Sequence, residues 1–200
     1  FVSFMPVGCM TETNFHHSLV GYTIGPLLIF ALMLLAYRKS KESDNRLANT
    51  IFGYFLALTF LILPSVSIKI FSTFACRTFD GDYGSFLKVD YSVDCGGDEH
   101  KFYEKYAALM VLVYPIGIPF MYFVLLYRKR GMLDPGQEKF TFEAGSKKMG
   151  LKKAIEERDG LVRSEPGLAS LSFLFSAYEP RCWWFEIVET LRRLVLTGGL

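Results

Sequence analysis

Three long stretches without a charged residue constrain this chain more than any other feature. They cover residues 19–37, 47–68 and 106–127. Each is close to the ~20 residues that a helix needs to cross the ~30 Å hydrocarbon core of a bilayer. Buried helices of a large soluble protein are the alternative, but those are usually shorter, and the remaining residues could hardly cover three of them. We therefore expect an all-α, polytopic bundle of transmembrane helices.

The first three spans are placed at 19–37, 47–70 and 106–127, and a fourth, truncated span is expected over 183–200. The sequence opens on Phe rather than Met and closes inside an apolar run, so we expect a fragment of a longer polypeptide. No basic segment precedes the first apolar run, which is therefore not a typical signal peptide.

Positive charges give these spans an orientation. Arg128, Lys129 and Arg130 follow the third span, four Lys and Arg fall within 38–46, and residues 1–18 contain none. Positively charged flanks stay cytoplasmic. The distribution predicts that residues 1–18 and 71–105 are external. It predicts that residues 38–46 and 128–182 are cytoplasmic. The net charge of the whole chain is only +2, which argues against a nucleic-acid partner.

The cysteines agree with this topology. Cys9, Cys76 and Cys95 fall on the predicted external side, where disulfides form, and Cys182 falls at the opposite interface. Between Cys76 and Cys95 the Asp-Gly turn and the short β-type runs at 85–89 and 91–93 favour a small hairpin. We predict that one disulfide closes this loop, with free thiols as the alternative. Cys9 would then pair outside the chain.

The third span contains helix-breaking residues at its centre. Pro115 and Pro119 lack a backbone N–H, and Gly117 lies between them. We expect a kink or a broken helix, which persists in a membrane only where protein or a water-filled path satisfies the freed carbonyl groups. A packing kink without a transport role is the alternative.

The beginning of the fourth span is unusually charged. Glu186, Glu189 and Arg193 share one helical face, and Arg192 lies within three residues of Glu189. Ionisable groups in a membrane favour a functional role, so these four residues form a candidate gating stripe. The alternative is an interfacial belt among lipid headgroups, anchored by Trp183 and Trp184.

The cytoplasmic segment divides into two parts. Residues 131–165 carry mixed charges and indicate a solvated linker with a short helix. Apolar residues then recur at helical spacing over 168–178, opposite serines, which predicts an amphipathic interfacial helix leading into the fourth span. Such a helix could couple cytoplasmic events or membrane tension to the bundle.

The other motifs of the sequence give little information about function. The sequence has no P-loop, HExxH, GxSxG or GxGxxG motif, and we assign no catalytic residue, metal ligand or cofactor, which counts against an enzyme. The GGDEH run at 96–100 is a coincidental likeness to a cyclase signature. The acidic residues of the external loop fail the EF-hand spacing, because Ser85 and Tyr91 stand where Gly and Glu belong. His16 and His17 are expected at the membrane interface.

Several runs resemble a known group of proteins. The Cys76–Cys95 loop, the YPIGIP run of the third span and the YEP, WWFE and ETLRR runs after it are similar to the C-terminal membrane region of large multi-pass proteins of algae and other protists. That region is described as a TRP-like C-terminal domain, and the resemblance covers most of the chain from about residue 71 onward. It implies Cys-rich repeats of ephrin-receptor or EGF-like type upstream, where a partner for Cys9 would lie.

The resemblance, the broken span and the charged stripe together imply a TRP-like channel or a sensory membrane protein of the plasma membrane or an endomembrane. The alternative is a receptor or adhesion protein, whose helices anchor and relay signals from a Cys-rich ectodomain without conducting ions. Expected partners are the lipid bilayer and other transmembrane helices of the same protein. A second copy of the chain and a cation are further candidates.

Overall fold

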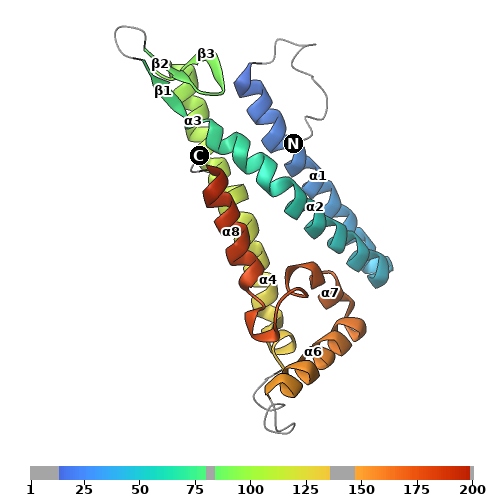
Figure 1. Cartoon of the computed structure of the whole chain (residues 1–200). Helices are drawn as coiled ribbons and strands as arrows, with labels where there is room; N and C mark the ends of the chain where they lie inside the picture. The colour runs from blue at the N-terminus through green and yellow to red at the C-terminus, as the bar shows by residue number, and fades with distance from the viewer. Residues whose placement is uncertain (1–13, 80–83, 136–146, 199–200) are drawn as a thin grey trace.

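The computed structural model describes residues 14–79, 84–135 and 147–198. Two long helices come first, α1 (Phe15–Ser43) and α2 (Asn45–Ser72), and a third continuous helix runs from 98 to 133. The third helix consists of α3 (Asp98–Val111), the π-helical turn η2 (Leu112–Ile116) and α4 (Gly117–Leu133). In Figure 1, α1 and α2 lie side by side, and α8 (Phe185–Gly198) lies along α4.

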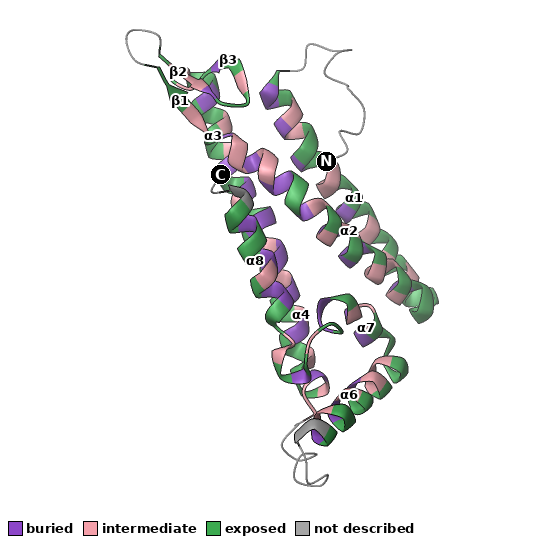
Figure 2. Cartoon of the chain, viewed as in Figure 1, coloured by how far each residue is buried: buried purple, intermediate pink, exposed green. Residues whose placement is uncertain are grey.

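Within the described residues, three helices are long and apolar enough to cross a membrane: α1, α2 and the continuous helix Asp98–Leu133. Many apolar side chains on these helices point outward. Leu32, Leu61 and Phe120 are each about two-thirds or more exposed. Figure 2 shows such exposed positions along the outer faces of the bundle. An exposed apolar belt on long helices is typical of a surface that faces lipid. The expected multi-pass, mainly helical class is confirmed at this level.

The predicted connection at 38–46 differs from the structure. α1 continues through Ser43 and α2 begins at Asn45, so only Asp44 lies outside the two helices. The Asp44 carboxylate accepts a hydrogen bond from the backbone N–H of Arg46 at 2.8 Å, which caps the start of α2. The basic residues therefore lie on helix ends rather than on the short loop that was expected.

The described loop residues form a three-stranded antiparallel sheet at one end of the bundle, made of β1 (Cys76–Thr78), β2 (Ser85–Leu87) and β3 (Asp90–Asp94). β2 and β3 are the predicted hairpin, and β1 is an additional edge strand. A disulfide joins Cys76 to Cys95, as predicted. The fold class therefore includes a small β element beside the helices. Cys9 and the rest of 1–13 lie outside the described residues.

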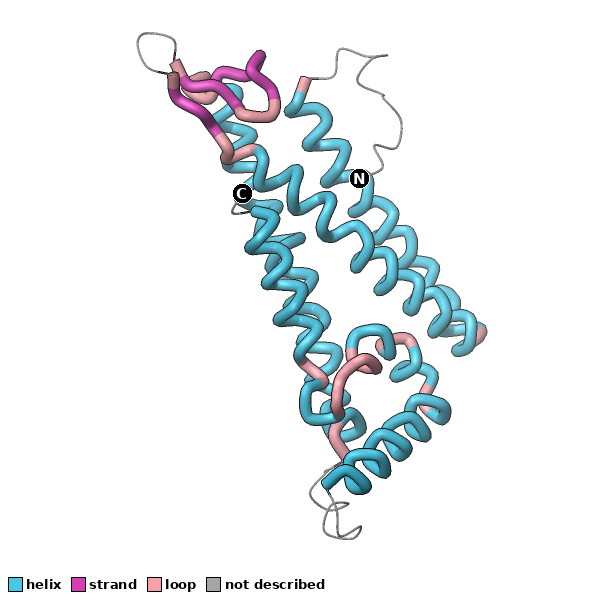
Figure 3. Tube along the Cα trace, viewed as in Figure 1, coloured by secondary structure: helices cyan, strands magenta, loops and turns pink. Residues whose placement is uncertain are grey.

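The opposite end of the molecule contains short elements after α6 (Lys147–Ser164). These are α7 (Pro166–Ala169) and the 3-10 turns η3 (Ser172–Leu174) and η4 (Pro180–Cys182). The single amphipathic helix predicted over 168–178 is wrong. Leu168, Leu174 and Phe175 are buried in the bundle core instead of forming one stripe on a membrane surface. Figure 3 shows the loops that separate these short turns.

Candidate functional site

The interruption in the third helix is a π turn. Pro115 lies inside η2, and α4 begins directly after it at Gly117. A Cβ atom at Gly117 would lie 2.9 Å from the carbonyl oxygen of Leu112, which is closer than side-chain carbons approach backbone oxygens. Glycine is therefore required for this turn. Pro115, Gly117 and Pro119 do mark a local break, and the helix continues on both sides of it.

The π turn keeps one face of the helix inside the protein. Buried side chains recur every four residues, at Met110, Tyr114, Ile118, Tyr122 and Leu126. In a regular α-helix, steps of four residues drift around the axis by about 40° each. A π turn contains more residues than an α turn and takes up part of that drift. The interruption thus aligns the buried residues of α4 with those of α3.

Tyrosine hydroxyls connect this buried face to the first two helices. Tyr114 donates a hydrogen bond to the carbonyl oxygen of Thr23 at 2.6 Å. The hydroxyls of Tyr122 and Thr59 lie 2.7 Å apart, and those of Tyr106 and Thr23 lie 2.5 Å apart. The sequence prediction missed these contacts, although tyrosine at intervals of eight residues was a visible signal. The broken span was expected to face either protein or a water-filled path. On this side it faces protein.

The charged residues of α8 pair with one another. Glu189 accepts hydrogen bonds from Arg192 at 2.6 and 2.7 Å and from Arg193 at 3.1 Å. The carboxylate of Glu189 is mostly covered, whereas both arginine side chains are more than half exposed. The negative charge of Glu189 compensates the charge of one arginine, so the three groups together keep one net positive charge. Whether this stripe has a gating role stays a prediction.

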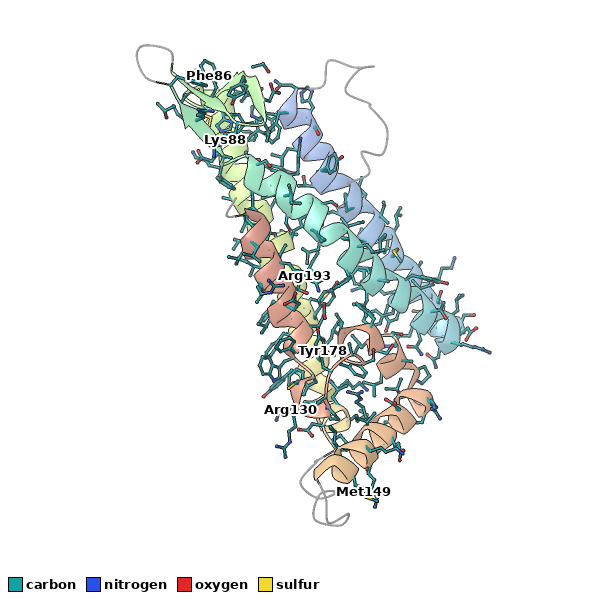
Figure 4. All side chains as sticks on the ribbon, in the orientation of Figure 1. Phe86, Lys88, Arg130, Met149, Tyr178 and Arg193 are labelled. Carbon is teal, nitrogen blue, oxygen red and sulfur yellow. A yellow bond between two sulfur atoms is a disulfide. The ribbon has the colours of Figure 1, made fainter. Side chains whose placement is uncertain are left out.

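Glu186 has a partner that the sequence prediction did not name. The hydroxyl of Tyr178 donates to Glu186 Oε2 at 2.6 Å, and Glu186 is only 9% exposed. This hydrogen bond to a carboxylate raises the pKa of Tyr178 above its ordinary value. Figure 4 places Tyr178 near the start of α8, with Arg193 further along the same helix.

Arg158 of α6 holds the segment that contains Tyr178. Its guanidinium donates to the carbonyl oxygen of Tyr178 at 2.8 Å and to that of Phe175 at 3.4 Å, and Arg158 is only 3% exposed. The charged stretch was predicted to be a solvated linker, so this buried arginine was missed. Because Arg163 and Arg181 follow in the same segment, the sequence offered no signal that distinguished Arg158.

The two predicted interface anchors differ in their surroundings. The Trp183 ring stacks on Phe123 of α4, with ring centroids 6.2 Å apart. Trp184 is 43% exposed. The tryptophans therefore lie at the base of α8, one against the bundle and one outward. Anchoring to lipid headgroups stays a prediction for both.

The sheet end contains a second polar cluster. His16 was expected at the membrane interface, but it is buried and lies 3.2 Å from the buried His100, nitrogen to nitrogen. His17, next to it, is exposed. Of the acidic loop residues, Asp80 and Asp82 lie outside the described part of the chain. Among the described ones, Asp90 accepts from Ser92, and Asp94 accepts from the N–H of Gly96. The bonds from Ser92 hold the pKa of Asp90 below its ordinary value. Among the described residues, the group with spacing suited to a metal is Cys76, Cys95 and His100.

Comparison with known protein families gives no match, and no curated protein or solved structure matches the chain either. The class is therefore defined by the structure itself: three apolar helices long enough to cross a membrane, which indicate a multi-pass membrane protein. The resemblance to TRP-like proteins and every more specific function are proposals.

Proposed function

We propose that this chain is part of a TRP-like channel or sensory membrane protein, in which cytoplasmic events act on the charged helix α8. The observation that carries the proposal is a continuous connection from α6 to α8. Arg158 holds the backbone of Tyr178, and the hydroxyl of Tyr178 holds the carboxylate of Glu186. A movement of α6 therefore changes the surroundings of a buried carboxylate.

The charges of α8 support the same proposal. Glu189, Arg192 and Arg193 lie on a helix that packs against α2 and α4. Ionisable residues beside a membrane-spanning bundle are costly and favour a functional role. The π turn of the third helix supports it as well, because such turns occur frequently at functional sites and allow a helix to change its register.

Current recording on the complete protein tests this proposal, with delivery to the cell surface measured in parallel. Glu186→Gln, Glu189→Gln and the double variant Arg192→Gln/Arg193→Gln neutralise the stripe. We expect each to change the size or the activation threshold of the current. The matched control is Lys152→Gln/Glu156→Gln, which neutralises an exposed ion pair on α6. Unchanged currents at normal surface levels would remove the stripe from the mechanism.

The alternative is a receptor or adhesion protein whose helices relay signals without conducting ions. The sheet end favours it, because the disulfide-closed sheet exposes aromatic and aliphatic side chains at Phe79, Val89 and Tyr91. Exposed aromatic residues on a rigid element are common in protein contacts. Silence under voltage, stretch and calcium challenge, with normal surface delivery, would favour this second function.

A further inference from the structure

Two cysteines and a histidine from three different elements meet at the sheet end. β1 supplies Cys76, the residue after β3 is Cys95, and the first turn of α3 supplies His100. One ligand atom from each lies within 4.8 Å of the other two. His100 Nε2 points at the Cys76 sulfur across 3.8 Å, and His100 is only 3% exposed. The disulfide occupies this cluster in the structure.

The other nitrogen of His100 is held by a chain of side chains. His100 Nδ1 lies 3.2 Å from His16 Nε2, and His16 Nδ1 lies 3.7 Å from the Glu99 carboxylate. The His16 ring is fixed by stacking on Tyr103, with ring centroids 4.1 Å apart. If each Nδ1 carries the proton, His16 Nε2 accepts from His100 Nδ1–H, His16 Nδ1–H faces the Glu99 carboxylate without a hydrogen bond, and His100 Nε2 keeps a free lone pair. Metal-binding histidines are commonly held in this way, through the nitrogen that does not bind the metal.

We propose that this cluster, once its disulfide is reduced, binds one thiolate-preferring divalent cation such as Zn²⁺ through Cys76 Sγ, Cys95 Sγ and His100 Nε2. His16 is a positioning residue for His100. A thiol reductant supplies the two electrons: two RSH and the disulfide give two cysteine thiols and RSSR. The cation then binds both sulfurs as thiolates, and two protons are released to water.

The distances suit this site. Tetrahedral zinc places a sulfur and a nitrogen ligand about 3.6 Å apart, given its usual bond lengths, and His100 Nε2 and Cys76 Sγ are 3.8 Å apart. The two sulfurs must separate to about 3.8 Å in such a site. The Cα atoms of Cys76 and Cys95 are 6.4 Å apart, so rotation of the side chains provides that separation. Water takes the fourth position.

Disulfide formation and metal binding exclude each other in this proposal, because the same two sulfurs are used. The cluster would therefore report the redox state of its compartment by exchanging a covalent link for a metal link between β1, β3 and α3. Since binding releases protons, the affinity falls as the pH falls. The inference does not depend on whether the protein conducts ions.

The test uses the purified chain in detergent, with Cys9→Ser and Cys182→Ser so that only the two cluster cysteines remain. The chain is reduced with a phosphine, which adds no competing thiol, and titrated with Co²⁺ and then Zn²⁺. We expect one Co²⁺ per chain with the strong absorption of cobalt–thiolate bonds, and displacement by one Zn²⁺. Bound Zn²⁺ also protects both thiols from a maleimide reagent.

Three histidine variants assign the ligands. His100→Ala weakens Co²⁺ binding at least as much as loss of an orienting partner, which is about 10–100-fold. His16→Ala weakens it about 10-fold, and His16→Gln, whose carbonyl accepts the same bond, restores part of that loss. His17→Ala, at the exposed neighbouring position, leaves the affinity unchanged. Circular dichroism checks that each reduced variant keeps its helices.

Three outcomes overturn the proposal. The first is a reduced, helical chain that takes up no Co²⁺, and the second is equal binding by the oxidised chain. The third is equal binding by His100→Ala, which would show that the cysteines alone hold the metal. Unchanged affinity in His16→Ala overturns the positioning role of His16.

Discussion

The two ends of the molecule are held together by different kinds of bonds. The sheet end, residues 76–100 with the first turn of α1, is closed by a disulfide, and it buries Phe15, Leu87 and Val93 against it. The α6 end, residues 147–186, has no disulfide among its described residues and is held by buried apolar side chains, such as Leu174 and Phe175, and by side-chain hydrogen bonds from Arg158 and Tyr178. Local opening is easiest where few strong contacts must break. We therefore expect conformational change to begin at the α6 end, which no described disulfide closes.

The largest expected effect comes from removing the disulfide. The bridge spans 19 residues of sequence, and closing a loop of that size stabilises the folded state by about 3 kcal/mol. In Cys76→Ser/Cys95→Ser we expect amide hydrogen exchange to accelerate strongly over 85–94 and to stay unchanged over 172–182. Mass spectrometry of exchanged peptides measures both regions in one experiment.

Cys182→Ser is the matched control, because it removes a free cysteine at the other end of the chain. Exchange in the sheet should not respond to it. If the loss of the disulfide accelerates exchange equally at both ends, the two ends unfold as one unit and the comparison fails.

The apolar helices and the disulfide could be predicted because each follows from a local rule. The absence of charge over about 20 residues identifies a span, and the two cysteines lie on the same predicted side of the membrane. The interruption at Pro115 and Pro119 is also local, since proline removes its own N–H. Its π geometry was not predictable, because it depends on the match between the buried faces of α3 and α4.

The predictions failed where tertiary contacts replaced helical hydrogen bonds. Residues 168–178 have the spacing of a helix, yet the carbonyl group of Tyr178 accepts from Arg158, and that of Phe175 accepts from Arg158 and from the N–H of Tyr178 only three residues on. His16 and His100 are separated by 84 residues, so no local pattern could bring them together. The histidine pair and the arginine are long-range features, and propensity does not encode them.

A smaller effect is expected from Arg158→Ala. The substitution removes the guanidinium donor from the carbonyl oxygen of Tyr178 and one of two donors from that of Phe175, which costs about 2 kcal/mol. We expect faster hydrogen exchange over 172–182 and no change in the sheet, the reverse of the disulfide variant. Arg158→Lys keeps the charge but not the fork of donors and should recover only part of the loss.

Arg163→Ala is the control for this second prediction, since Arg163 lies exposed on the same helix. It should leave exchange over 172–182 as it is in the parent chain. If Arg163→Ala and Arg158→Ala behave alike, the buried hydrogen bonds are not what holds this segment, and the proposed connection from α6 to α8 loses its first step.

The smallest effect concerns the hydroxyl of Tyr178. Tyr178→Phe removes one hydrogen bond to the Glu186 carboxylate at a partly exposed position, which costs about 1 kcal/mol.

The pH dependence of this stabilisation has a definite sign. The pKa of Tyr178 is raised in the folded chain, so the stabilisation is fully present below the ordinary value of 10.0 and is lost as the pH rises through the raised pKa. Alkaline absorbance titrations of parent and variant isolate this tyrosine by difference. The same pair of titrations on the Glu186→Gln background provides the control, because that variant lacks the carboxylate that raises the pKa of Tyr178. If the difference curve is the same with and without the Glu186 carboxylate, Glu186 does not act on Tyr178, and the step that joins the α6 end to the charged helix is absent.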